Sequence, residues 1–123
     1  SYKLKMHQDE RGNFSEFLKN RDAGQLSFFT INPGSTRGQH YHHTKNEKFL
    51  VVKGSAKFRF RNILNNEVFS MEVNDKDPEV VETIPGWVHD ITNSGKDKTV
   101  VMLWANEIFN QELPDTYVSD IEI

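Results

Sequence analysis

The chain has 123 residues, which predicts a single domain, and its 36% of hydrophobic residues include nine Phe, enough bulk for a packed core. A formal net charge of −3 provides no basic surface, so we do not expect DNA or RNA as partners. No apolar stretch approaches the ~20 residues of a membrane span, and cysteine is absent, so we expect a soluble, cytoplasmic protein without membrane contact.

Short apolar segments with a period of two follow one another along the chain. The first lies within residues 22–31, and the later ones contain KFLVV, AKFRFR, EVFSMEV, EVVETI and KTVVMLW. The segments between them are rich in Gly, Asn, Asp and Pro, and they recur at spacings of roughly 8–12 residues, as in sandwiches and barrels. This pattern predicts an all-β sandwich or small barrel.

The AKFRFR segment shows this alternation most clearly. Phe58 and Phe60 fall on one face of the expected strand, and Lys57, Arg59 and Arg61 fall on the other. We therefore expect one face to be buried and the three basic side chains to face solvent.

Three of the five histidines lie within residues 40–43, in the stretch GQHYHHTKNEKFLVV. Because side chains alternate along a strand, His40 and His42 project to one side, and Tyr41 and His43 to the other. Two imidazoles on one side can share a metal ion. The alternative is a solvated polar loop, because histidines are also tolerated in exposed turns.

Two further candidate ligands come later in the chain. Residues 44–46 have the composition of a turn, and a hairpin there places Glu47 opposite the two histidines. His89, in IPGWVHDITN, begins an apolar strand after a turn, and only tertiary folding can bring it to the others. Three nitrogen ligands and one carboxylate suit several divalent ions, with zinc as the first choice for non-redox chemistry and iron as the second.

These residues also carry a resemblance to a known superfamily. Gly34, His40-x-His42, Glu47 and Gly54 match the first cupin motif at every position. PGWVHDITN resembles the second cupin motif, with one residue fewer before its histidine. The resemblance implies a cupin fold, which is a jelly-roll β-sandwich barrel, and it implies that the two histidines, the glutamate and His89 line a metal site.

Two more segments, DERGNFSEF (9–17) and TRGQHYH (36–42), resemble nucleotide-sugar epimerases of deoxysugar pathways. Arg11 and Arg37 can each offer a planar fork to the diphosphate of a nucleotide sugar. Taken alone, each segment is also consistent with a charged turn or a Gly-driven loop. Trp87 is a further candidate for substrate contact by stacking on a base or sugar, although a large aromatic in a small β domain more often belongs to the core.

Over nearly its whole length the chain is similar to the cupin domain of the bifunctional capsular polysaccharide enzymes that work toward UDP-N-acetyl-L-fucosamine. HYHHTKNEKFLVVKG and LWANEIFNQELPDTY carry this likeness. In that family an NADPH-dependent reductase domain precedes a zinc-containing C3 epimerase domain. The resemblance implies that residues 1–123 are a single cupin domain, excised from the C-terminal part of a longer protein whose reductase domain is absent here.

The activity implied by the resemblance is metal-dependent C3 epimerisation of a UDP-linked 4-keto-6-deoxy-N-acetylhexosamine in the synthesis of capsular polysaccharide precursors. In metal-free epimerases a lysine lies where Glu47 falls, so a metal held by Glu47 supplies the missing positive charge. His40 aligns both with the general base of those enzymes and with the first cupin ligand, and one lone pair cannot serve both roles at once. His40, His42 and Glu47 are therefore candidates for catalysis as well as for metal binding.

Two other classes of function remain open from the sequence. One is a sugar-binding cupin without turnover, and the other is a metal-dependent oxygenase or ketoisomerase, because one fold hosts many chemistries. We also expect a homodimer, because small cupin sheets have edges that require cover and family members commonly pair through sheet edges and N-terminal strands.

Overall fold

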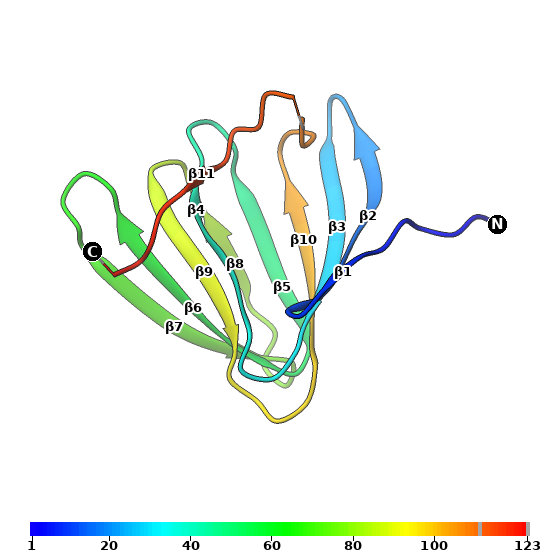
Figure 1. The fold of residues 1–123 in the computed structure, drawn as a ribbon, viewed down its shortest axis with the longest axis horizontal. Coiled ribbons are helices and arrows are strands. Elements are labelled where there is room, and N and C mark those ends of the chain that lie inside the picture. The colour runs from blue at the N-terminus through cyan, green and yellow to red at the C-terminus, as the bar shows by residue number, and fades with distance from the viewer. Residues whose placement is uncertain (111, 123) are drawn as a thin grey trace.

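The computed structural model describes residues 1–110 and 112–122, which form eleven strands in two antiparallel sheets that face each other (Figure 1). The six-stranded sheet has the order β1 (His7–Asp9), β2 (Gly12–Asn20), β3 (Gly24–Ile31), β10 (Thr99–Ala105), β5 (Glu47–Lys53) and β8 (Val80–Thr83). The five-stranded sheet has the order β11 (Tyr117–Val118), β4 (Thr36–Tyr41), β9 (Trp87–Asn93), β6 (Ser55–Asn62) and β7 (Val68–Asn74). Within these residues we find no helix that is long and apolar enough to cross a membrane.

The predicted all-β architecture is confirmed, and every apolar segment with period two forms a strand. Three strands were not expected from the sequence. β1 and β11 have three and two residues, too few to show a period. In β2 the pairing register with β3 shifts between Glu16 and Leu18, so the alternation of its side chains is interrupted.

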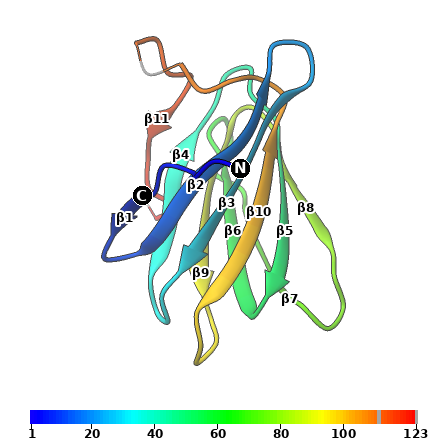
Figure 2. The ribbon, with the colours of Figure 1, turned by 90° about the vertical axis from the view of Figure 1, so that its right-hand side faces the viewer.

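The core fills the space between the two sheets, and it is built from the inward positions of both. Phe49 lies at its centre, with its ring packed edge-on against Phe29 and Phe58 at centroid distances of 6.2 and 5.5 Å. Such edge-to-face pairs add about 0.5–1.5 kcal/mol to the free energy gained by burial. Figure 2 is viewed toward β2, β3 and β10 of the six-stranded sheet, with β9 and β6 of the other sheet behind them.

The outer face of β6 differs from the expectation. Lys57 is exposed, but Arg59 forms an ion pair with Asp90 at 2.6 Å, and Arg61 is only 8% exposed. The prediction that Arg61 faces solvent is wrong, because the chain after β11 runs across this face (Figure 1). There the Arg61 guanidinium donates to the carbonyl of Asp120 at 2.8 Å, which satisfies a buried cation with a main-chain acceptor.

A β-bulge in β4 decides which side chains of this strand face inward. Arg37 lies opposite Ile91 of β9 and His40 lies opposite His89, so one strand advances three residues while the other advances two. The extra residue is Gln39, whose φ is 62°, and it follows Gly38, whose φ is 99°. Strict alternation would separate Arg37 from His40, whereas the bulge puts both on the inner face.

We predict that Gly38→Ala lowers the free energy of unfolding by about 2–4 kcal/mol, because it adds a backbone clash to the strain of a left-handed residue. A Cβ at Gly38 lies 2.7 Å from the carbonyl oxygen of His89. The matched control is Gly34→Ala, because Gly34 has a φ of 79° but a Cβ there meets nothing within 4 Å, so only the strain of about 1–2 kcal/mol is expected. Urea unfolding measures both, and equal losses would show that the clash at the bulge does not matter.

Candidate metal centre

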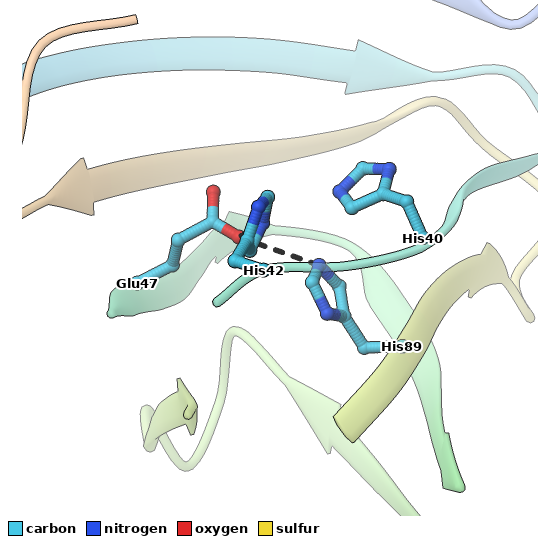
Figure 3. Close-up of side chains that lie close together, drawn as sticks. All are labelled: His40, His42, Glu47 and His89. Carbon is cyan, nitrogen blue, oxygen red and sulfur yellow. Dashed lines mark hydrogen bonds and ion pairs between the residues drawn. The ribbon is translucent and has the colours of Figure 1, made fainter. Parts of the chain in front are cut away.

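The four predicted ligands converge at one end of the space between the sheets. His40 is near the end of β4, His42 follows that strand, Glu47 is the first residue of β5, and His89 lies in β9 (Figure 3). One ligand atom from each lies within 4.8 Å of those of the others. His42, Glu47 and His89 are buried, whereas His40 is partly exposed. The structure thus brings together the whole predicted set.

The route by which Glu47 reaches the histidines differs from the prediction. β4 pairs with β9 and β11, whereas β5 pairs with β10 and β8, so β4 and β5 belong to different sheets. The predicted hairpin over residues 44–46 is therefore wrong. These residues cross from one sheet to the other, and Glu47 meets the histidines across the interior. The alternation of side chains indicates on which face of a strand each residue lies, but it does not indicate which strand pairs with which.

One oxygen of Glu47 is the centre of the hydrogen bonding. Oε1 lies 2.8 Å from His42 Nε2 and 3.3 Å from His89 Nε2, and it accepts a hydrogen bond from Thr83 Oγ1 at 3.4 Å. Burial raises the pKa of Glu47, but the hydrogen bonds from His42 and His89 outweigh it and lower the pKa well below its usual value. The carboxylate is therefore ionised in the interior.

The hydrogen bonds of His42 define its protonation. Its Nδ1 donates to the carbonyl oxygen of Asp115 at 2.5 Å, and a carbonyl can only accept, so Nδ1 carries a proton. Its Nε2 faces the Glu47 carboxylate, which is also an acceptor. Burial lowers the pKa of His42, but the hydrogen bond with Glu47 overcomes this and raises it. The imidazolium form thus fits the pair, and a metal at this point replaces the proton on Nε2.

His40 has a ligand atom within 4.8 Å of those of the other three residues, but the short contacts of Glu47 Oε1 are with His42 and His89. Its ring centroid lies 4.6 Å from that of His89 and 5.0 Å from that of His42. Burial, reinforced by the nearby His89, lowers the pKa of His40 to about 3. The neutral imidazole therefore has a lone pair available at physiological pH, as either a ligand or a base requires.

A cavity of about 560 Å³ opens beside the four residues, and Arg11, Arg37 and Lys45 contribute cationic side chains to its wall. Arg37 donates from Nε to the carbonyl of Thr30 at 3.2 Å, while its Nη2 is buried and has no partner within the described part of the chain. Such an orphaned donor in a cavity wall is chemically suited to an anion. Burial lowers the pKa of Arg37, and the neighbouring Arg11 adds to this effect.

The other two predicted substrate contacts, Arg11 and Trp87, are less available to bind a ligand. Arg11 is held by Asp9, with an Nη2–Oδ2 distance of 2.6 Å, and this bond lowers the pKa of Asp9 to about 2. Its guanidinium fork is therefore already largely occupied. Trp87 packs against the hydrophobic core instead of lining the cavity, which is the alternative that the sequence left open for a large aromatic.

Lys45 was missed by the sequence reasoning. It was predicted only as part of a turn, yet it is 6% exposed, and its Nζ lies over the Phe109 ring at 5.3 Å from the centroid. Among residues 1–110 and 112–122, no carboxylate lies within ion-pair distance of this ammonium group. The one available signal was its spacing of two from Glu47, which points both side chains to one side of an extended chain.

Comparisons with known proteins identify the family and the relatives of the chain. The sequence model of the family described as polysaccharide biosynthesis C-terminal domain matches residues 7–117. The chain is 59% identical over 121 residues to the UDP-2-acetamido-2,6-beta-L-arabino-hexul-4-ose reductase of Pseudomonas aeruginosa, covering 98% of this chain and 32% of that protein. It therefore spans about a third of that relative's length. The expected likeness to capsular polysaccharide enzymes is confirmed.

Among solved structures, the chain is similar to a capsular polysaccharide protein and to a cupin domain. The capsular polysaccharide assembling protein CapF from Staphylococcus aureus has a TM-score of 0.95 and 45% identity, covering 98% of this chain and 35% of that chain. The cupin domain of Drosophila melanogaster CENP-C has a TM-score of 0.69 and 16% identity, covering 83% of this chain and 74% of that one. The second likeness concerns the fold alone, and the predicted cupin fold is confirmed.

We predict that Zn²⁺ affinity falls as the pH is lowered through the raised pKa of His42, by up to about tenfold per pH unit, because the Nε2 proton competes with the metal. Glu47 stays ionised and His40 stays neutral over pH 5.5–8, since both pKa values are lowered. Competition with a chromophoric chelator across this range measures the affinity. His40→Ala is the control and should keep the same slope, while an affinity that does not change with pH would contradict the assignment of the His42 proton.

Proposed function

The chain belongs to the polysaccharide biosynthesis C-terminal domain family, and from that premise we propose that it epimerises C3 of a UDP-linked 4-keto-6-deoxy-N-acetylhexosamine for capsular polysaccharide synthesis. The observation that carries this proposal is the cavity in which His40, His42 and Glu47 lie beside the orphaned guanidinium of Arg37. A metal centre next to an anion-binding group suits an anionic ketosugar. We place the reaction in the cytoplasm, because nucleotide sugars are expected there.

The reductase name of the Pseudomonas relative belongs to a protein about three times as long as the matched segment. The chain contains no Gly-rich dinucleotide fingerprint. We assign reduction to the part of such relatives that lies outside the match, and epimerisation to the cupin domain. Epimerisation needs no nicotinamide, because a proton leaves C3 and a proton returns to the opposite face.

In this proposal His42, Glu47 and His89 hold the metal. Their ligand atoms already meet at Glu47 Oε1, at 2.8 and 3.3 Å. Two imidazoles and one carboxylate form a donor set found in catalytic zinc sites, in which a fourth position stays open. Zinc is therefore the first choice, and when bound it polarises the C4 carbonyl as a Lewis acid.

His40 is then free to take the C3 proton. It is the member of the set that lies away from Glu47 Oε1, and it lines the cavity in a neutral state. An imidazole with so low a pKa is a weak base, so the C3–H bond must be made acidic by positive charge at the ketone oxygen. The buried ammonium of Lys45 supplies a second positive charge in the same cavity.

The diphosphate is assigned to the two arginines in unequal roles. Arg37 offers a buried donor that lacks a partner, whereas Arg11 must exchange its bond to Asp9 before it can bind phosphate. Arg37 therefore provides the main contact. Trp87 is left out of the site, because it packs against the core.

A homodimer is also part of the proposal, and the outer face of the six-stranded sheet supports it. Met102 lies opposite Phe28 and Leu50 in neighbouring strands, and alternation places all three on the face away from the core. Leu18 and Val52 extend this apolar face and are 54% and 44% exposed. A contiguous apolar face of this kind commonly marks an interface.

The first test of function is hydrogen exchange at C3. In deuterated water, without NADPH, the metal-loaded protein should incorporate deuterium at C3 of a UDP-linked 4-keto-6-deoxy sugar and invert that centre, as followed by NMR. Removal of the metal should abolish exchange while the circular dichroism spectrum is retained. A folded, metal-loaded protein that gives no C3 exchange would exclude the epimerase and favour the sugar-binding cupin.

A pair of variants separates the base from the ligands. His40→Ala should keep bound metal but lose at least about a hundredfold in C3 exchange, since general-base catalysis contributes typically 10²–10⁴-fold. His89→Ala should lose the metal itself. Elemental analysis and exchange rates are measured on both, and loss of metal in His40→Ala would assign His40 to the ligands instead.

The oligomeric state is tested by light scattering at micromolar concentration. The native chain should be a dimer, and Met102→Glu should be a monomer because it places a charge in the apolar face. Val118→Glu, at a 90% exposed position in the other sheet, is the matched control and should stay dimeric. A monomeric native chain would remove the dimer from the proposal.

A further inference from the structure

Asp115, in the segment between β10 and β11, contacts four consecutive residues of the crossing that follows β4. Its carboxylate accepts hydrogen bonds from the backbone N–H groups of His43, Thr44 and Lys45 at 2.9, 2.8 and 3.0 Å. It also accepts one from the Thr44 hydroxyl at 3.0 Å. The Asp115 carbonyl accepts the Nδ1 proton of His42. One residue therefore joins two segments that are more than 60 positions apart in sequence.

The carboxylate of Asp115 accepts hydrogen bonds from backbone that has no strand partner. Residues 42–46 lie outside both sheets, so their N–H groups receive no ladder hydrogen bonds. An anion that faces three successive N–H groups satisfies them together, and charge-assisted hydrogen bonds are roughly twice as strong as neutral ones. Burial raises the pKa of Asp115, but these backbone hydrogen bonds outweigh it and lower the pKa well below its usual value.

The backbone carbonyl of Asp115 contacts the imidazole of His42 directly. A proton on Nδ1 leaves the Nε2 lone pair of neutral His42 directed at the position where Glu47 and His89 meet. Residues 112–116 belong to no strand, and β11 has only two residues, so regular sheet pairing does little to fix this carbonyl. The carboxylate of the same residue provides the missing anchor.

We propose that Asp115 is a positioning residue for the metal centre: its carboxylate fastens the segment before β11 onto residues 43–45, and its carbonyl thereby sets the tautomer and direction of His42. The proposal rests on the proposed function in one respect, that His42 is a metal ligand. Asp115 touches neither metal nor substrate in this role. Outer partners of this kind typically change metal affinity by 10–100-fold when they are lost.

The coupling works in both directions. If docking of Asp115 favours the metal-binding form of His42, then metal bound at Nε2 must favour docking by the same factor. The backbone N–H groups of residues 43–45 should therefore exchange more slowly with solvent in the metal-loaded protein than after metal removal. A purely structural anchor would not respond to the metal.

The test compares Asp115→Ala with Asp120→Ala. Asp120 lies after β11, and among the residues that the structure describes its carboxylate caps the local N–H of Glu122 alone, so it serves as the matched control. Zn²⁺ affinity is measured by chelator competition, and the His42 tautomer is read from ¹⁵N NMR of the imidazole at a pH above its pKa. Asp115→Ala should bind Zn²⁺ about 10–100-fold more weakly and lose the pure Nδ1–H tautomer, whereas Asp120→Ala should match the native protein.

Each result decides the proposal. Native affinity and tautomer in folded Asp115→Ala would overturn it. If Asp115→Ala does not fold, Asp115→Asn takes its place, because it keeps the side-chain volume but turns an NH₂ group toward N–H donors. Weaker Zn²⁺ binding by Asp115→Asn supports the proposal, and native binding overturns it. If the native protein binds no Zn²⁺, the proposed metal function fails, and loss of the Nδ1–H tautomer in the variant still decides whether Asp115 positions His42.

Discussion

The structure depends on an ionised carboxylate held in the interior. Glu47 is only 7% exposed, and an unpaired charge at such a position costs several kcal/mol. The cost is offset because His42, His89 and Thr83 all direct hydrogen bonds or positive charge at the same oxygen. Positive charge is therefore required at this point, and either the His42 proton or a divalent ion can provide it. This exchange of a proton for a metal makes the cluster suitable as a metal centre.

Irregular backbone at the ends of regular strands delivers the functional groups. The bulge at Gly38 and Gln39 turns Arg37 and His40 to the same inner face. The crossing over residues 42–46 carries Lys45 into the cavity, and the Asp115 carboxylate holds it there. The two sheets provide the rigid frame from which these segments project, so small irregularities set the geometry of the site while the core maintains stability.

The sequence predicted the all-β fold and the candidates His40, His42 and Glu47 because these depend on short-range spacing, whereas His89 was implied by the resemblance to the second cupin motif. His40 and His42 are two apart, and turn residues mark where β5 and β9 begin. The predicted hairpin at residues 44–46 was wrong because alternation identifies a face and not a partner strand. Arg61 was assigned to solvent and the burial of Lys45 was missed, because the segments that cover both residues come from the far C-terminal part of the chain. Such contacts leave no local pattern in the sequence.

The central claim is that three residues form the metal centre and a fourth stands beside it. Anomalous diffraction at the zinc edge, from crystals of the metal-loaded protein, tests this directly. We expect one peak, about 2.0–2.2 Å from His42 Nε2, His89 Nε2 and a Glu47 oxygen, with an open position toward the cavity and His40 beyond bonding distance. A peak bonded to His40, or no peak between the two sheets in protein that contains zinc, would contradict it.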